Sequence, residues 1–276
     1  MRKFIIAAII ALLAGISVMF YAGKELLSEL RMTTEANAAY DGFSETMRKA
    51  AAVEIGYLAS GGKSPEAAMP DADGIGAEAE PQIIVPDIYI PDFEIDFEAL
   101  RMINEDAAAW LYGPGTAIDY PVMMADDYKY YLNHLIDGKV NANGSIFIDY
   151  NNDPGFGDEL TVVYGHNMKS GNMFGSLKNY KKQAYYDEHP YIYLYTEQGN
   201  YRIDLIYGFV ISAGTWSERA FMHAENVGSL LDHAQKNTTF ISDYAHEKGD
   251  RIIALSTCSY EFNNARYVVV GVLRGG

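Results

Sequence analysis

Apolar residues in the C-terminal two thirds of the chain come in short runs separated by turns. Runs rich in β-branched and aromatic side chains predict strands at residues 118–122, 145–149, 160–164, 191–195, 201–211, 251–255 and 266–273. Turn residues such as those at 151–155 and 198–200 separate the runs, and Pro121 marks the first run as a short or edge strand. Because the strands are many and do not alternate with helices, we expect a mainly β, mostly antiparallel closed barrel of about eight strands.

Apolar residues at helical spacing predict helices around this barrel. Such spacing covers residues 97–110, before Gly113, and a second helix is expected at 128–135. The insert 217–249 is too long for a hairpin. Its apolar positions between 227 and 234 follow helical spacing, which predicts a surface helix whose Leu230 and Leu231 pack on the barrel.

Residues 4–22 form 19 consecutive uncharged and mostly apolar positions, preceded by Arg2 and Lys3. As a helix, this length just crosses the hydrocarbon core of a bilayer, and the basic residues favour an internal N-terminus. We therefore expect residues 1–23 to be a single-pass signal anchor in the cell membrane, with the rest of the chain extracytoplasmic. A cleavable signal peptide is the alternative, although its apolar core would be about 7 to 15 residues long. It would also export the chain.

Residues 24–91 have the composition of an extracytoplasmic stalk and linker. The segment 24–58 is polar and rich in alanine and glutamate, which favours a helical stalk, although Gly42 argues against one unbroken helix. Residues 61–86 contain four glycines and four prolines, as linkers do. From residue 24 to residue 98 there are 5 basic and 16 acidic side chains, a net charge of −11 out of −16 for the whole chain. Self-repulsion is expected to keep this region extended.

The remaining residues, 92–276, are expected to form one globular domain. About 185 residues rich in aromatic and β-branched side chains are enough for a single core. The acidic balance and the lack of basic clusters argue against nucleic-acid binding. The histidines are scattered and no acidic loop has calcium-binding spacing, so we expect no metal and no other cofactor.

Cys258 is the only cysteine in the chain, so it cannot form an intramolecular disulfide. It lies just after the predicted strand 251–255, and Arg266 begins the next predicted strand. If the two strands pair, the thiol and the guanidinium come together. An arginine beside a thiol favours the reactive thiolate and offers fixed donors to an oxyanion. The alternative is that Cys258 is a small buried apolar residue without chemistry.

A cysteine nucleophile needs an acid/base partner, and His166 is the best placed of six histidines. It follows the predicted strand 160–164 and stands next to Gly165, where a backbone can turn and a side chain can face a cleft. The sequence around the other five histidines gives no comparable indication of an active-site position; His189, for example, precedes Pro190.

Several motifs resemble, in the family's order, those of the class B sortases, which are cysteine transpeptidases of Gram-positive cell surfaces. They are Gly115-Thr-Ala-Ile-Asp-Tyr-Pro-Val122, Gly144-Ser-Ile-Phe147, Tyr164-Gly-His-Asn-Met168, Met173-Phe-Gly-Ser-Leu177, Leu255-Ser-Thr-Cys258 and Arg266. The similarity covers roughly residues 92–276. It implies a sortase barrel in which Cys258 is the nucleophile, His166 the acid/base and Arg266 the group that holds substrate and oxyanion.

The resemblance also implies the reaction. A sorting signal of a secreted surface protein is cleaved through a thioester on Cys258, and the product passes to an amine of a peptidoglycan precursor or of another surface protein, as in pilus assembly. Two other classes remain open on the residues alone. One is a cysteine hydrolase with the same Cys258/His166 pair; the other is a membrane-tethered binding domain in which the thiol is inert.

Four residues near the catalytic positions are candidates for substrate binding, namely Ser256, Thr257, Asn167 and Ser259. Ser256 and Thr257 either orient substrate by hydrogen bonding or are simply strand-end residues. Many class B sortases have an acidic residue directly after the cysteine, where this chain has Ser259. If that carboxylate orients a catalytic group, this chain does without it or recruits another.

Overall fold

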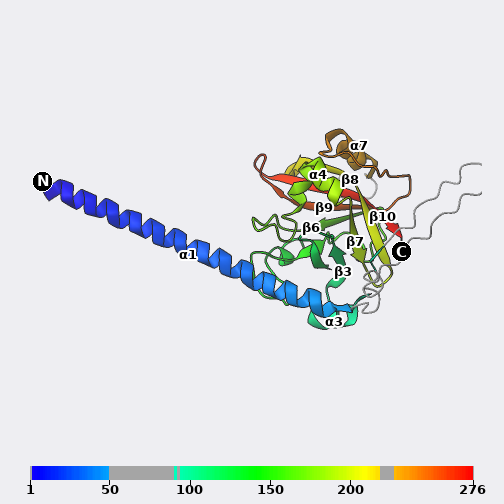
Figure 1. Cartoon of the computed structure of the whole chain (residues 1–276), viewed down its shortest axis with the longest axis horizontal. Helices are drawn as coiled ribbons and strands as arrows, with labels where there is room; N and C mark the ends of the chain where they lie inside the picture. Colours follow the sequence, from blue (N-terminus) through cyan, green and yellow to red (C-terminus); the bar gives the residue numbers. More distant parts are fainter. Residues whose placement is uncertain (1, 50–89, 92–93, 218–226, 276) are drawn as a thin grey trace, which may run out of the picture.

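A computed structural model of the chain describes residues 2–49, 90–91, 94–217 and 227–275, and shows a barrel from which a long helix, α1 (Arg2–Met47), projects (Figure 1). The barrel is closed and has the strand order β10-β8-β7-β3-β4-β5-β6-β9. Its strands are β3 (Ala107–Tyr112), β4 (Asp119–Met123), β5 (Ile146–Ile148), β6 (Leu160–Tyr164), β7 (Tyr191–Tyr195), β8 (Asn200–Ser212), β9 (Ile252–Ser259) and β10 (Ala265–Gly275). The predicted eight-stranded, mainly β barrel is confirmed.

Smaller elements surround the barrel. They are the two-stranded pair β1 (Arg48–Lys49) and β2 (Glu94–Ile95), the helices α3 (Phe97–Ile103), α4 (Gln183–Glu188), α5 (Ala213–Ser217) and α7 (Val227–Asn237), and the 3₁₀ turns η1 (Tyr130–Leu132) and η2 (Leu177–Lys181).

Most neighbouring strands of the barrel are antiparallel, as predicted, but two pairs are parallel. These are β4 with β5, and β6 with β9. Pro121 lies on β4, opposite Trp110 of β3, while β5 pairs only with Val122 and Met123. The proline therefore lies outside the stretch of β4 that pairs with β5, where its missing N–H costs no ladder bond.

Apolar side chains fill two cores, one on each face of β10. Val269 packs in the barrel interior, whereas Val268 and Val270 pack outside it, beneath α7. Because side chains alternate along a strand, a strand with a core on each side must be apolar throughout. Leu230 and Leu231 of α7 are buried in this outer core, as expected. The insert helix thus covers the outer face of the barrel and packs mainly against β8.

The predicted helix at 97–110 is wrong in its second half. Helix α3 ends at Ile103, and Asn104 has extended backbone angles. Residues from Ala107 onward instead form β3 between β4 and β7, where Trp110 is fully buried and its indole N–H donates to Asp119 at 2.8 Å. Burial of the tryptophan in the barrel therefore overrides the helix propensity of the alanine run.

The predicted helix at 128–135 is reduced to the short turn η1. The side chain of Asp127 accepts hydrogen bonds from the backbone of Lys129 and Tyr130, which starts the turn. The chain then bends back, and His134 bridges to Val140 in an antiparallel pair. Tyr131 points into the core and is fully buried.

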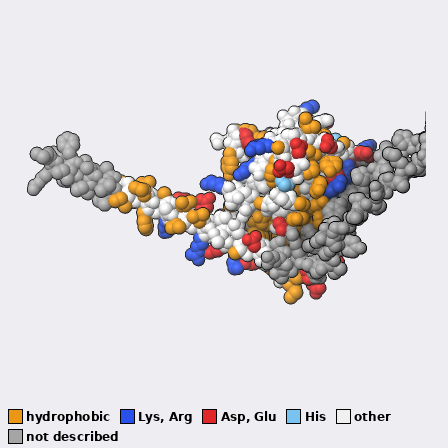
Figure 2. All heavy atoms as spheres, in the orientation of Figure 1, with side chains coloured by type: hydrophobic (Ala, Val, Ile, Leu, Met, Phe, Trp, Pro, Cys, Tyr) orange, Lys and Arg blue, Asp and Glu red, His pale blue; other side chains and the backbone are white. Residues whose placement is uncertain are grey.

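Helix α1 includes the segment 4–22 and continues without a break through Gly42, which the sequence had suggested would interrupt it. Within the described part of the chain, which leaves out the side chains of residues 2–13, no helix is long and apolar enough to span a membrane. The predicted linker at 61–86 lies outside the described residues. Figure 2 shows apolar side chains along the projecting part of α1, where Leu26, Leu27 and Leu30 are exposed.

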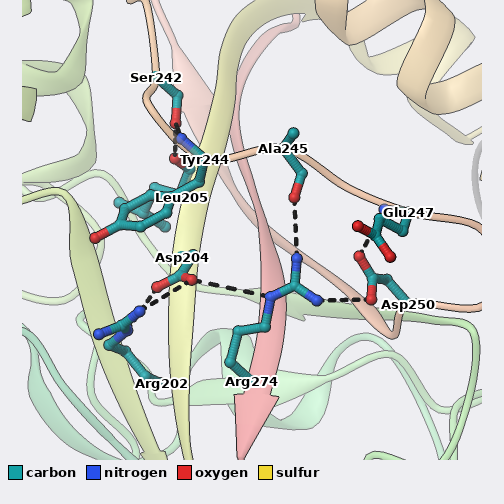
Figure 3. Close-up of polar contacts among 9 residues, drawn as sticks. All are labelled: Arg202, Asp204, Leu205, Ser242, Tyr244, Ala245, Glu247, Asp250 and Arg274. Atoms are coloured by element: carbon teal, nitrogen blue, oxygen red, sulfur yellow. Dashed lines mark hydrogen bonds and ion pairs between the residues drawn. The ribbon is translucent and has the colours of Figure 1, made fainter. Parts of the chain in front are cut away.

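A network of charged residues joins the loop before β9 to the barrel (Figure 3). Asp204 of β8 accepts from Arg202 at 2.6 and 3.2 Å, and Arg274 of β10 lies 3.9 Å from the same carboxylate. Arg274 also donates to Asp250 at 2.7 Å and to the carbonyl of Ala245 at 3.0 Å. The network fixes the point from which β9 runs toward Cys258.

Candidate active site

Cys258 and Arg266 face each other across the ladder of β9 and β10. The two residues are direct partners in the antiparallel register. Side chains of such partners have Cβ atoms about 4.5–5.5 Å apart on one face of the sheet. Strand β9 extends beyond the predicted 251–255, so Cys258 is its second-last residue, and its side chain is half-buried.

His166 is brought to Cys258 by the parallel pairing of β6 and β9. In this register Tyr164 lies beside Ser256. Two residues further along each chain stand His166 and Cys258, and neighbouring strands run about 4.8 Å apart. The sequence-predicted trio of cysteine, histidine and arginine therefore comes from three adjacent strand ends.

Hydrogen bonds continue beyond the last paired residues of β6 and β9. The N–H of Gly165 donates to the carbonyl of Ser256 at 3.2 Å, and the hydroxyl of Thr257 donates to the carbonyl of Gly165 at 2.7 Å. The amide of Asn167 donates to the carbonyl of Cys258 at 2.8 Å. These bonds fasten the loop that carries the histidine to the strand that carries the thiol.

The imidazole of His166 is oriented by a backbone carbonyl. Its Nε2 lies 2.7 Å from the oxygen of Leu132. Because a carbonyl oxygen only accepts, Nε2 carries the hydrogen, and Nδ1 is the nitrogen that accepts a proton when the ring is neutral. By contrast, the rings of His134 and His189 stack on or pack against Tyr130 and Tyr185.

Cys258, His166 and Arg266 line one cavity of about 530 Å³. Its wall is largely apolar and aromatic, formed by Tyr128, Leu132, Phe147, Tyr164, Ala213 and Trp216. Glycines 165 and 214 and residues Ser256 and Thr257 complete it. A cavity of this size that is lined by a thiol, an imidazole and a guanidinium is able to hold a peptide segment while the backbone carbonyl of that segment is attacked.

A buried carboxylate lies behind the aromatic wall. Asp149 is 1% exposed and accepts hydrogen bonds from the hydroxyls of Tyr128, at 3.1 and 3.2 Å, and of Tyr164, at 2.9 Å. Burial, together with the charge of Asp149, raises the pKa of both tyrosines. They therefore stay protonated and hold their rings fixed in the cavity wall.

The four candidates for substrate binding occupy different positions. Ser256 lines the cavity, and its buried hydroxyl has no hydrogen-bond partner among the described residues. Thr257 also lines the cavity but uses its hydroxyl on Gly165, and Asn167 uses its amide on Cys258.

Ser259, in contrast, interacts with a charged pair outside the cavity. It donates to Glu261 and accepts from Lys181 of η2 at 3.1 Å. Lys181 also forms an ion pair with Glu261. A carboxylate, Glu261, is thus present two residues beyond Ser259, where its partners are Ser259 and Lys181.

Sequence reasoning missed part of the cavity wall and the carboxylate behind it. Trp216 and Asp149 belong to no motif singled out above, although Phe147 and Tyr164 stand within two of them. Asp149 follows β5 and Trp216 lies on α5, and these elements meet near the end of β9 only in the folded chain. For Tyr128, the aromatic content of residues 128–131 was the available signal.

Comparison with known proteins gives a consistent result. A Sortase domain matches residues 111–274. Sortase B of Listeria monocytogenes is 32% identical over 177 residues, which are 63% of this chain and 72% of the relative. A structure of a Staphylococcus aureus sortase B–substrate complex has a TM-score of 0.59 and 29% identity over 64% of this chain and 84% of that chain. A sortase B complexed with triglycine has a TM-score of 0.58 and 28% identity over 64% and 85%.

The fold, the cavity and these comparisons agree, and the chain belongs to the sortase family, within its class B. Members of this class are cysteine transpeptidases that act on the sorting signals of surface proteins.

Proposed function

We propose that Cys258, His166 and Arg266 are the residues with which this chain performs transpeptidation. The observation that carries the proposal is that Cys258 and Arg266, directly opposite each other on one hairpin, line a single cavity with His166, which is more than 90 positions earlier in the sequence. A buried structural thiol would have no reason to face a histidine and an arginine in a peptide-sized cavity.

In the first half of the reaction, the thiolate of Cys258 attacks the carbonyl carbon of the scissile peptide bond. A C–S bond forms, and the carbonyl oxygen becomes an oxyanion that the guanidinium of Arg266 stabilises. The C–N bond then breaks as the imidazolium of His166 gives its proton to the leaving amine. A thioester on Cys258 and a neutral His166 remain.

In the second half, an acceptor amine replaces the departed segment. The nitrogen of the acceptor amine attacks the thioester carbon while neutral His166 takes a proton from that amine. The C–S bond then breaks and releases the thiolate of Cys258. The new amide joins the surface protein to the acceptor. The triglycine complex of a related sortase B supports an acceptor with an unhindered terminal amine. We place it on a peptidoglycan precursor or on another surface protein.

The cavity wall suggests how the sorting signal is held. Aromatic and aliphatic side chains favour apolar parts of a peptide, while the hydroxyl of Ser256 offers a donor and acceptor to a polar one. The complex of a related enzyme with its substrate supports a sorting-signal peptide as the occupant. Thr257 and Asn167 hold the backbone that carries Cys258.

We place the enzyme at the cell membrane. Residues 4–22 are apolar over a membrane-spanning length, and the basic residues before them favour an extracytoplasmic remainder. In this arrangement residues 1–23 are the anchor, residues 24–91 connect it to the barrel, and residues 92–276 form the catalytic domain.

The test is acyl transfer by the wild-type chain and by Cys258→Ala. Sorting-signal pentapeptides and several amines are offered together, and products are identified by mass spectrometry. Wild type should form a new amide, whereas Cys258→Ala should form no product while keeping its thermal melt, because a small apolar side chain replaces another at a half-buried position. Transfer by the alanine variant would overturn the proposal. Release of free acid only, at saturating amine, would identify a hydrolase instead.

A further inference from the structure

The C-terminal part of α1 touches both loops that surround His166. The histidine loop (residues 165–175) carries His166 itself. The carbonyl loop (residues 130–145) contains Leu132, whose oxygen binds the His166 ring. Both loops lie between barrel strands, so ladder bonds alone do not fix the imidazole. Figure 1 shows α1 reaching the barrel along the edge where these green loops lie.

Tyr40 of α1 is bound to the end of the carbonyl loop. The side chain is 4% exposed, and its hydroxyl lies 3.0 Å from the carbonyl of Gly144 and 2.8 Å from the hydroxyl of Ser145. The N–H of Ser145 donates in turn to the carbonyl of Tyr131 at 2.9 Å. At Gly144, where φ is +58°, a Cβ would come within 2.4 Å of that carbonyl. Tyr40 therefore binds Ser145, which is hydrogen-bonded to Tyr131, the residue directly before Leu132.

Two asparagines extend the contact between α1 and the loops. Asn141 of the carbonyl loop donates to the backbone carbonyl of Met32 at 3.0 Å. Asn172 of the histidine loop donates to the side chain of Asn37. Each loop is therefore hydrogen-bonded to α1 directly.

A second route joins Tyr40 to the histidine loop. Its ring packs edge-on against the ring of Tyr120, with 5.2 Å between centroids, and the hydroxyl of Tyr120 accepts from the N–H of Met173 at 3.3 Å. The next N–H, of Phe174, donates to the carbonyl of His166 at 3.0 Å. The helix thus braces the backbone of His166 as well as the oxygen that orients its ring.

We infer that α1, through Asn37 and Tyr40, is a positioning element that holds the His166 imidazole in register with Cys258. The inference rests on the proposed role of His166 as acid/base. A general acid must lie within hydrogen-bond reach of the proton it moves, and a misplacement of about 1 Å can cost about a hundredfold in rate. The helix that leads to the proposed membrane segment is then also part of the catalytic geometry.

The experiment uses the full chain with the substitutions Asn37→Ala and Tyr40→Phe, alone and together. The double variant should lower kcat about tenfold or more, with KM for the sorting peptide nearly unchanged, because the thiol side of the site is untouched. Asn172→Ala, which breaks the Asn37 contact from the loop side, should reproduce the effect of Asn37→Ala. The matched control is Glu35→Ala, which removes an exposed ion pair with Arg31 on the same helix and should leave kcat unchanged.

Nitrogen NMR of the histidine rings provides a readout independent of turnover. At a pH where the ring is neutral, His166 of the wild type should show one tautomer with hydrogen on Nε2, and His166 of the double variant the averaged signals of two tautomers. A folded double variant with wild-type kcat and an unchanged His166 spectrum would overturn the inference. If His166→Ala keeps full activity while the spectrum still changes, the role of His166 fails and the positioning by α1 stands.

Discussion

Arg266 lies across the β9–β10 ladder from Cys258, and its guanidinium is held at the cavity by its own strand. One of its terminal nitrogens donates to the carbonyl of Ala265 at 3.1 Å. This bond fixes the planar group beside the thiol, where in the proposed mechanism its donors meet the charge that develops on a substrate carbonyl.

Arg266→Lys should therefore fold normally but lose activity. A lysine ammonium is a compact charge that does not reproduce the planar fork. We expect a loss of about 2.7 to 4 kcal/mol of transition-state stabilisation, roughly a hundred- to a thousandfold in kcat/KM. Steady-state kinetics paired with thermal melts measures it. Activity within a few-fold of wild type would remove Arg266 from the site.

The sequence indicated Cys258, His166 and Arg266 because each stands at the border of a predicted strand and a turn, where a side chain can face a cleft, and because all three belong to motifs that resemble those of class B sortases. It did not indicate Trp216 or Asp149, which have ordinary surroundings in the sequence. They reach the site through barrel closure, and a single sequence has no local signal for that.

At the scale of elements, the β9–β10 hairpin is braced against η2 by Glu261, Ser259 and Lys181. Burial opposes ionisation of Glu261, but the hydrogen bonds from Lys181 and Ser259 outweigh it and lower the pKa of the carboxyl below its ordinary value of 4.5. Because the folded-state pKa is depressed, the stabilisation is present above the ordinary pKa and is lost as pH falls through the folded-state pKa.

Glu261→Gln should lower stability at neutral pH and abolish this pH dependence. The side chains of Glu261 and Lys181 are 38% and 28% exposed, so solvent screening limits the loss to about 1 kcal/mol. Thermal melts of both proteins between pH 3 and pH 7 should converge at the acid end. Melting curves that stay parallel at every pH would show that the ion pair contributes nothing.

Elements with strong periodicity were predicted well, and those that depend on neighbours were not. The apolar runs at 160–164 and 191–195 became β6 and β7 with the same bounds. The alanine-rich half of 97–110 satisfies a helical pattern equally well, and only the slot between β4 and β7 makes it a strand. Likewise, the segment around Tyr131 forms a short turn and not the predicted helix, because the ring of Tyr131 is buried in the core.

At the scale of the molecule, the network around Asp204 lies on the outer face of the barrel, since its neighbours on β8, Ile203 and Leu205, belong to the interior core. It is separated from the proposed active site along β8, where Arg266 pairs with Ile211. Asp204 is 5% exposed in its side chain, and Arg202 and Arg274 are 15% and 29% exposed. Asp204 thus compensates the largely buried guanidinium of Arg202, whereas Arg274 pairs with both Asp204 and Asp250.

Asp204→Ala should reduce the free energy of unfolding by about 3 kcal/mol, because breaking a buried pair leaves an uncompensated charge. The lower end of the range applies, since Arg274 remains partly hydrated. Urea unfolding measures the loss, and kcat of the folded fraction should stay near wild type. A loss below about 1 kcal/mol would mean that the arginines find other partners.

The number and length of the predicted strands indicated a barrel, but they did not indicate the order in which the strands pair. The parallel pairs β4–β5 and β6–β9 join segments whose register no local residue specifies. The sequence also suggested an extended, self-repelling stalk, whereas Ala36 and Tyr40 of α1 are buried against the barrel. The net charge of this segment predicted that it would stay extended, but a few apolar contacts are enough to hold α1 against the barrel.

The parallel join of β6 and β9 also determines when the enzyme becomes active during folding. The hydrogen bond from Thr257 to Gly165 spans 92 residues of sequence, and the intervening chain contains β7, β8 and α7. Contacts of such long sequence separation form late, because the entropy of closing the loop must first be offset by the structure between its ends. In a chain that has not yet formed this pairing, Cys258 and His166 are not held together, so we expect peptide cleavage to require closure of the seam between β6 and β9.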